Sequence, residues 1–99
     1  MLTIEQIKNT VTDYFKDKPV KKVYLFGSYA RGEAKENSDV DLGVVIDDSH
    51  KRMSLWQYAG IAMGLEEMLH VKVDMVELHL MHNWVKESFE QDRIEIYTA

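Results

Sequence analysis

The sequence contains no cysteine, only one proline and no apolar run long enough to cross a membrane. Without cysteine there is no disulfide framework and no thiolate metal site, which suits a reducing cytoplasm. Residues 1–10 are amphipathic and interrupted by charge, unlike a signal peptide or a span of about 18 apolar residues. We therefore predict a cytoplasmic protein without a membrane segment.

Positive charge is also scarce, since 12 Lys and Arg stand against 17 Asp and Glu, for a net charge of −5. This balance disfavours nucleic acid as the main substrate, because protein surfaces that bind nucleic acid are usually basic. A small acidic protein can still present a local basic patch. The composition is that of a folded protein, with 45% apolar residues. Ninety-nine residues suffice for one domain with a core, so we predict a single domain over residues 1–99.

The most informative stretch, residues 23–47, begins as a strand followed by a turn. The apolar run of residues 23–26 stops at Gly27 and Ser28, where a glycine allows the backbone to turn tightly. Ser28 to Arg31 fits the start of a short helix, whose first N–H groups can hold phosphate oxygens. Arg31 adds a cation nearby. This turn is therefore a candidate phosphate site.

A second strand follows, and two aspartates stand at its start. Asp39 and Asp41 precede an apolar run that ends at Ile46, and residues two apart on a strand face the same side. Adjacent carboxylates repel unless a cation lies between them, and Mg²⁺ is commonly held by carboxylates together with substrate phosphates. Taken alone, the Gly27-Ser28 turn and the Asp39-x-Asp41 pair are each ordinary at turns or strand ends. Their order along the chain favours a metal and phosphate site.

The string from Gly27-Ser28 through ten residues to Asp39-x-Asp41 resembles the signature of the DNA polymerase β-like nucleotidyltransferase superfamily, and in particular its minimal prokaryotic branch. The resemblance implies an α/β fold with a small mixed sheet and helices packed mainly on one face. It implies that Asp39 and Asp41 are catalytic ligands of Mg²⁺, with two ions expected. It also implies that Gly27, Ser28 and Arg31 bind the nucleotide substrate, ATP. For Arg31, a salt bridge to the nearby Glu33 is the alternative.

A third carboxylate is expected on another strand. Residues 71–77 alternate as a strand does and carry Asp74. In the resembling family a third carboxylate lies beside the Asp-x-Asp strand, and Asp74 is the matching position. It would complete the metal site or take a proton from the acceptor. Otherwise Asp74 is a solvent-facing residue of an edge strand. Glu77 is the second choice, although its opposite parity turns it away from Asp74.

The remaining patterns predict further helices and strands around this site. The helices cover about residues 3–17, 51–70 and 79–91, and the other strands cover residues 20–26 and about 94–97. Thr3 and Gln6 have the spacing of a capping box at the start of the first helix. In the last helix, apolar spacing predicts that Met81, Trp84, Val85 and Phe89 are buried. A metal bound by His79 and His82 is a weaker alternative to a surface histidine pair.

The helix over residues 51–70 has a wide apolar arc. Trp56 and Met63 lie beside the stripe that is expected to pack on the sheet. The arc indicates either a helix wedged across the sheet or, in addition, a surface for a partner, because wide apolar faces of small domains often mark interfaces. Gly60 and Gly64 are expected to allow close approach by another element.

Function follows from the resemblance. Larger relatives carry an added domain that binds the acceptor, and this sequence ends at Ala99 without one, so a separate acceptor protein is expected. The implied partner is a HEPN-type helical toxin, often a ribonuclease, which receives AMP on a tyrosine while the nucleotidyltransferase acts as antitoxin. The alternatives are a binding module that neutralises a partner through the residue 56–68 face, or a nucleotidyltransferase for a small molecule or RNA end. Each of these three functions is compatible with a homo-oligomer or a hetero-oligomer.

Overall fold

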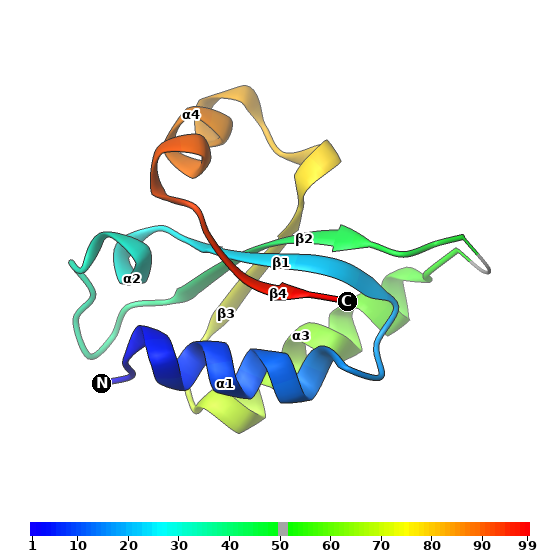
Figure 1. Ribbon diagram of the computed structural model, residues 1–99, viewed down its shortest axis with the longest axis horizontal. Helices are drawn as coiled ribbons and strands as arrows, with labels where there is room; N and C mark the ends of the chain where they lie inside the picture. Colours follow the sequence, from blue (N-terminus) through cyan, green and yellow to red (C-terminus); the bar gives the residue numbers. More distant parts are fainter. Residues whose placement is uncertain (50–51) are drawn as a thin grey trace.

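A four-stranded mixed sheet carries the fold in the computed structural model, which describes residues 1–49 and 52–99 (Figure 1). The strands lie in the order β3-β2-β1-β4; β2 and β3 are parallel, and the other pairs are antiparallel. The elements in chain order are α1 (Ile4–Phe15), β1 (Val20–Phe26), α2 (Ser28–Arg31), β2 (Val40–Ile46), α3 (Leu55–Leu69), β3 (Val73–Glu77), the 3-10 helix η1 (Leu78–Leu80), α4 (Asn83–Asp92) and β4 (Ile94–Thr98). The predicted α/β fold is confirmed.

Helix α1 begins at the predicted capping box. The Gln6 N–H donates to Thr3 Oγ1 over 3.0 Å, and the Thr3 N–H donates to Gln6 Oε1 over 2.8 Å. Two N–H groups that lack a partner inside the helix are satisfied in this way. Ile7, Val11 and Phe15 then follow at helical spacing and are fully buried against the sheet. The boundary and the packed face of α1 were both readable from the sequence.

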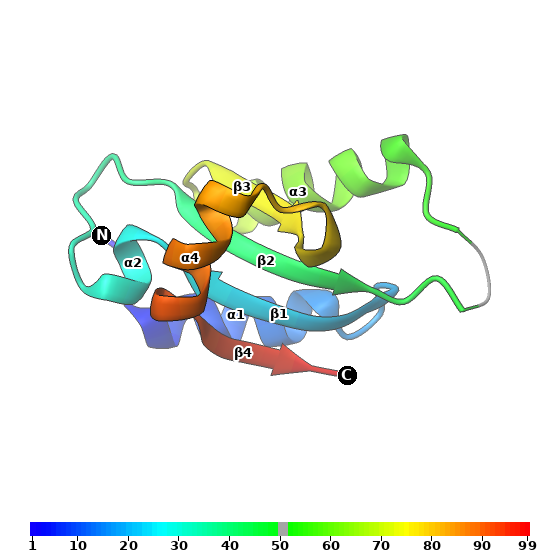
Figure 2. The same ribbon diagram turned by 90° about the horizontal axis from the view of Figure 1, so that it is seen from above.

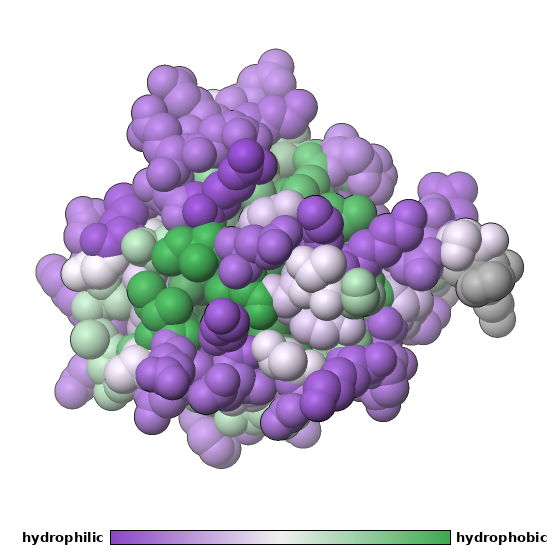
Figure 3. All heavy atoms as spheres, viewed as in Figure 1, coloured by the Kyte–Doolittle hydropathy of each residue, from purple (hydrophilic) through white to green (hydrophobic). Residues whose placement is uncertain are grey.

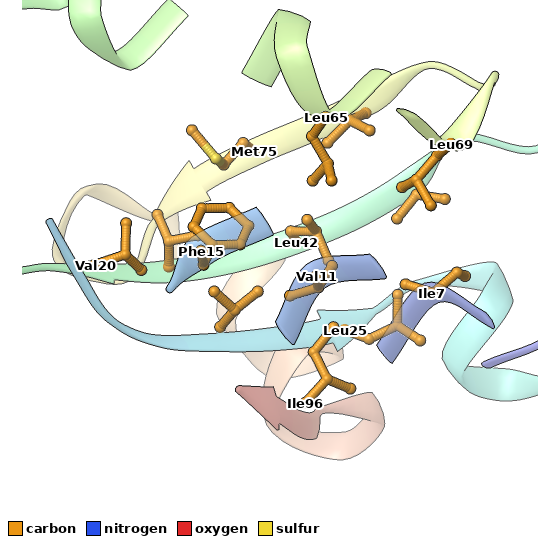
Figure 4. Packing of buried hydrophobic residues seen from close by; sticks show 14 of the residues in the cluster. Ile7, Val11, Phe15, Val20, Leu25, Leu42, Leu65, Leu69, Met75 and Ile96 are labelled. Atoms are coloured by element: carbon orange, nitrogen blue, oxygen red, sulfur yellow. The ribbon is translucent and has the colours of Figure 1, made fainter. Parts of the chain in front are cut away.

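The main core lies between the sheet and the helices α1 and α3, which cover the same face (Figures 1 and 2). Side chains from every strand and from both helices meet there (Figure 4): Ile7, Val11, Phe15, Val20, Leu25, Leu42, Leu65, Leu69, Met75 and Ile96. Burying apolar area of this kind is the main contribution to folding free energy. The core therefore sits below the sheet and leaves the other face available.

A smaller cluster lies on the opposite face, under α4. Phe26, Met81 and Phe89 form it, and the rings of Phe26 and Phe89 stack with centroids 5.3 Å apart. At Gly43, on the strand below, an added Cβ would lie 2.7 Å from Leu78 Cδ2, so a glycine lets this cluster pack closely. The helices are thus mainly on one face, while α4 covers part of the other (Figure 2). Among the described residues, no helix is long and apolar enough to cross a membrane.

Several predictions about the helices were wrong in detail. The last helix is divided into η1 and α4, and Trp84 is 80% exposed, because α4 packs through Val85 and Phe89 and position 84 turns outward onto the ring of His82. Helix α3 begins only at Leu55, where Ser54 is the N-cap; residue 51, at which the predicted helix began, lies outside the described part of the chain. Strand β3 begins at Val73 rather than 71.

The two glycines of α3 differ from each other. At Gly64 an added Cβ would collide with the hydroxyl of Tyr14, so this glycine does permit the expected close approach of α1. At Gly60 no atom of the described residues lies within 4 Å of an added Cβ, and the expectation there was wrong. Trp56 and Met63 point to solvent along the same side of α3. The wide apolar arc is therefore only partly used by the core.

Candidate active site

The three predicted carboxylates come together at one end of the sheet. Asp41 is the register partner of Phe26 in β1 and of Asp74 in β3, so it stands between the two strands. Asp39 lies two residues before Asp41, directly ahead of β2, and its negative charge acts on the Asp41 carboxylate. Asp39 and Asp41 are half-buried, and Asp74 is exposed. Parallel pairing of β2 with β3 thus joins residues that are 33 positions apart in the sequence.

Gly27 turns the chain directly against Asp41. Its φ is +78° and its ψ is −154°, a backbone conformation that side chains other than glycine rarely adopt. A Cβ added at Gly27 would also collide with the Asp41 carboxylate. The carbonyl oxygen of Gly27 accepts from the Arg31 N–H over 3.1 Å. Backbone and carboxylate therefore face each other without a side chain between them, which is a fitting shape for a ligand that touches both.

Helix α2 is a single turn between two glycines. Gly27 is its N-cap and provides no side-chain hydrogen bond, while Gly32 ends it in the left-handed conformation at φ +74°. Tyr29 turns inward from α2 into the main core, and its buried hydroxyl has no hydrogen-bond partner among residues 1–49 and 52–99. The burial of Tyr29 anchors α2 and keeps Ser28 at the end of β1.

Burial and the neighbouring acids together shape the electrostatics of the site. Burial, then the negative charges of Asp74 and Asp39, raise the pKa of Asp41 to about 6, and the positive charge of Arg31 opposes this rise. Burial and the two nearby negative charges thus both disfavour the ionised form of Asp41. A cation placed among these oxygens would relieve the repulsion.

The donor set fits Mg²⁺ in kind, since it consists only of carboxylate oxygens, which are hard ligands. Among residues 1–49 and 52–99, no group of three or more His, Cys, Asp or Glu side chains is arranged to hold a metal by itself. Mg²⁺ sites are commonly built from one or two carboxylates and substrate phosphates, so Asp39 and Asp41 need not form a complete cage. His79 and His82 belong to no such group either: His79 approaches Glu77 at 4.0 Å, and His82 stacks on Trp84.

Arg31 is engaged by two acids. Its Nε donates to Glu33 Oε1 and its Nη1 donates to Asp92 Oδ2, each over 2.7 Å. The salt bridge to Glu33 was the alternative weighed from the sequence, and it is present. Asp92, at the end of α4, was missed, because no local pattern connects residues 61 positions apart. Whether Arg31 also contacts phosphate stays a prediction.

Glu77 is separated from the carboxylate group. It lies at the far end of β3 and lines a cavity of about 570 Å³ between the ends of β2 and β3, the start of α3 and η1. Tyr58 lines the same cavity and donates to the Met75 carbonyl over 2.6 Å. Burial, then the charges of Glu77 and Asp74, raise the pKa of Tyr58 to about 12. None of Asp39, Asp41 and Asp74 lines this cavity.

The fold and the arrangement of the turn and the carboxylates define a nucleotidyltransferase. The family model described as "Nucleotidyltransferase domain" matches residues 4–97, which is nearly the whole chain. The chain therefore belongs to this family, as the resemblance implied.

The chain is also similar to individual proteins. The chain is 40% identical, over 97% of its own length and 100% of the relative's, to the "putative protein adenylyltransferase MJ1379" of Methanocaldococcus jannaschii. Its fold matches a chain of a toxin-antitoxin structure with AMP-PNP, at a TM-score of 0.77 and 22% identity, covering 93% of this chain and 73% of the other. It also matches a chain from the complex of tri-AMPylated Shewanella oneidensis HEPN toxin with MNT antitoxin, at a TM-score of 0.70 and 18% identity, covering 96% and 72%.

Proposed function

We propose that this protein transfers AMP from ATP to a tyrosine hydroxyl on a HEPN-type toxin in the cytoplasm, and so acts as the antitoxin. The observation that carries the proposal is the meeting of Asp39, Asp41 and Asp74 beside the Gly27 turn. The adenylyltransferase name of the 40% identical relative and the AMPylated toxin in the matched complex support it. Residues 1–99 act as one domain in this proposal.

The chain's own groups would bind and orient the nucleotide. The phosphates lie against the backbone of Gly27 and Ser28 and the start of α2, with Arg31 contributing positive charge. Asp39 and Asp41 would hold Mg²⁺, and Asp74 would either complete that site or take the proton of the acceptor. The ion would offset the negative charge of the carboxylates and the phosphates. At neutral pH Asp41 is mostly ionised, since its pKa is about 6. It is therefore ready to act as a ligand.

The transfer itself forms one bond and breaks another. The acceptor oxygen bonds to the α-phosphorus, the bond from the α-phosphorus to the bridging oxygen breaks, and pyrophosphate leaves with that oxygen. Asp74 is exposed, so its carboxylate is accessible to take the proton of the acceptor hydroxyl. Positioning of the two substrates supplies much of the rate, and no covalent enzyme intermediate is required.

The intact mass of the partner tests the proposal. The protein encoded beside this chain is co-expressed with the native chain or with the Asp39→Asn, Asp41→Asn double variant. One or more AMP units should appear on the partner only with the native chain. The Asp13→Asn, Asp17→Asn double variant removes two exposed carboxylates that precede the start of β1, whereas Asp41 pairs with the end of that strand, and it should leave the modification intact. An unmodified partner in the presence of the native chain would contradict the transferase proposal.

A second candidate function is neutralisation by binding alone. The observation that favours it is the unburied apolar side of α3, where Trp56, Met63 and Met68 are well exposed. If this function holds, the Asp39→Asn, Asp41→Asn variant still binds and neutralises the partner, whereas Trp56→Ser weakens the complex. If transfer is the function, the Asp double variant loses neutralisation. Toxicity assays with both variants separate the two.

A further inference from the structure

The two acids that hold Arg31 have different surroundings. The Glu33 side chain is 60% exposed and belongs to the loop that directly follows α2. The Asp92 side chain is 12% exposed and comes from the last residue of α4. Exposed ion pairs are weak, because water and salt compete with them, whereas a partly desolvated pair is harder to separate. The contact with Glu33 is therefore the one that another anion can replace.

Contacts other than the ion pair with Arg31 also hold Asp92 and the helix that carries it. The Ser88 hydroxyl, one turn earlier in α4, donates to Asp92 Oδ2 over 3.1 Å. Phe89 is 3% exposed and stacks on Phe26 with an interplanar angle of 13°. Phe26 is the last residue of β1 and directly precedes Gly27. The packing of α4 on Phe26 thus places Asp92, at the end of that helix, within reach of Arg31 at the end of α2. Figure 2 shows α4 near α2.

Arg31 is placed one helical turn beyond Gly27. Its own N–H donates to the Gly27 carbonyl, so its backbone cannot shift without the turn itself. Its side chain is flexible, however, and a guanidinium that keeps one partner loses less freedom when a second partner binds. With Nη1 held by Asp92, the other nitrogens of the Arg31 guanidinium can exchange Glu33 for a phosphate oxygen.

We propose that Asp92 is a positioning residue that holds Arg31 beside the phosphate site, and that Glu33 is its exchangeable partner, displaced by the phosphates of a nucleoside triphosphate. This inference rests on the proposed function, because it requires that a nucleotide binds at the Gly27 turn. It assigns opposite effects to two acids that make ion pairs of equal length with the same side chain.

Calorimetric binding of AMP-PNP with Mg²⁺ to the purified chain tests the inference. Asp92→Asn should weaken binding by about tenfold, the order expected for a lost charge-assisted hydrogen bond. Glu33→Gln should tighten binding about two- to threefold, because an exposed competing ion pair is removed. Glu90→Gln is the matched control: it removes an exposed α4 acid that pairs with Arg93 and should leave the affinity unchanged.

A double-mutant cycle separates positioning from a general structural role. If Asp92 acts through Arg31, Asp92→Asn should cause no further loss in an Arg31→Ala background. Equal losses in both backgrounds, native affinity in Asp92→Asn, or a weakening by Glu33→Gln would each overturn the inference. If Asp92→Asn folds poorly, Ser88→Ala is the milder variant, because it removes only the hydroxyl that donates to Asp92. It should also weaken the binding of AMP-PNP. A native chain that binds no AMP-PNP would contradict the proposed function as well, whereas failure of the variants alone contradicts only the role of Asp92.

Discussion

Gly27 faces the carboxylate of Asp41 so closely that a side chain at position 27 has no room. Replacing Gly27 with Ala should therefore combine backbone strain at φ +78° with a collision inside the site, and we expect a loss of about 2–4 kcal/mol in the free energy of unfolding. Chemical denaturation measures this loss. Gly32→Ala is the matched control, since φ is +74° there but nothing lies within 4 Å. It should lose only about 1 kcal/mol; equal losses would mean that the contact with Asp41 is unimportant.

The raised pKa of Asp41 predicts how stability changes with pH. Because the pKa in the folded protein, about 6, lies above the ordinary value of 3.8, ionisation of Asp41 destabilises the fold above pH 6. That penalty falls as the pH falls through 6 and is absent below the ordinary pKa. Asp41→Asn should thus stabilise the nucleotide-free protein by about 1 kcal/mol at pH 8, a figure reduced for partial exposure, and by much less at pH 4.

Thermal unfolding without divalent ions, at both pH values, measures this difference. Asp13→Asn, which removes an exposed carboxylate of α1, controls for the change in net charge. A gain from Asp41→Asn that is the same at pH 4 and pH 8 would contradict the assigned pKa.

The unpartnered hydroxyl of Tyr29 predicts that removing it stabilises the protein. Tyr29 is 4% exposed, and a buried hydroxyl without a hydrogen bond costs about 1–3 kcal/mol. Tyr29→Phe should therefore raise the free energy of unfolding by about 1 kcal/mol. Tyr14→Phe is the opposite case, because the Tyr14 hydroxyl donates to the Ile61 carbonyl over 2.7 Å. This variant should lower the free energy of unfolding by about 1 kcal/mol. Urea denaturation of both variants gives the comparison; a destabilised Tyr29→Phe would show that the hydroxyl has a partner in solution.

The two large aromatic residues of α4 should differ strongly in their effect on stability. Phe89→Ala removes a buried ring from the cluster above the sheet and should cost about 3–4 kcal/mol. Trp84→Ala changes an exposed side chain and should cost less than about 0.5 kcal/mol. Denaturant midpoints measure both. A large loss for Trp84→Ala would indicate that position 84 is buried after all, as apolar spacing alone had suggested.

The outer surface agrees with this view of α4. In Figure 3 the visible side of α4 is hydrophilic, and a hydrophobic area lies between α4 and α1 on the same face. Trp84 and Val85 are neighbours in the sequence, and either one fits an apolar face of α4 at helical spacing. The sequence alone could therefore not decide which of the two points toward the sheet. The cluster around Phe26 decided it, because only one rotation of α4 brings Phe89 onto that ring.

Local chemistry made most of the site predictable. The Gly27 turn, the strand that follows Asp39 and the capping box at Thr3 each depend on neighbours within a few residues, so their patterns are visible in the sequence. The family resemblance then supplied Asp74, whose alternating segment is also compatible with a simple edge strand. The catalytic and ligand roles of these residues stay predictions until they are tested.

The sequence by itself therefore determined the class of the protein, the start of α1, the bounds of β1 and the residue types at the turn. Only the tertiary structure decided that Asp74 pairs in register with Asp41, and that Arg31 is held by Asp92. The physical reason is that strand order and helix docking depend on how distant apolar surfaces are buried together, and no local pattern carries that information.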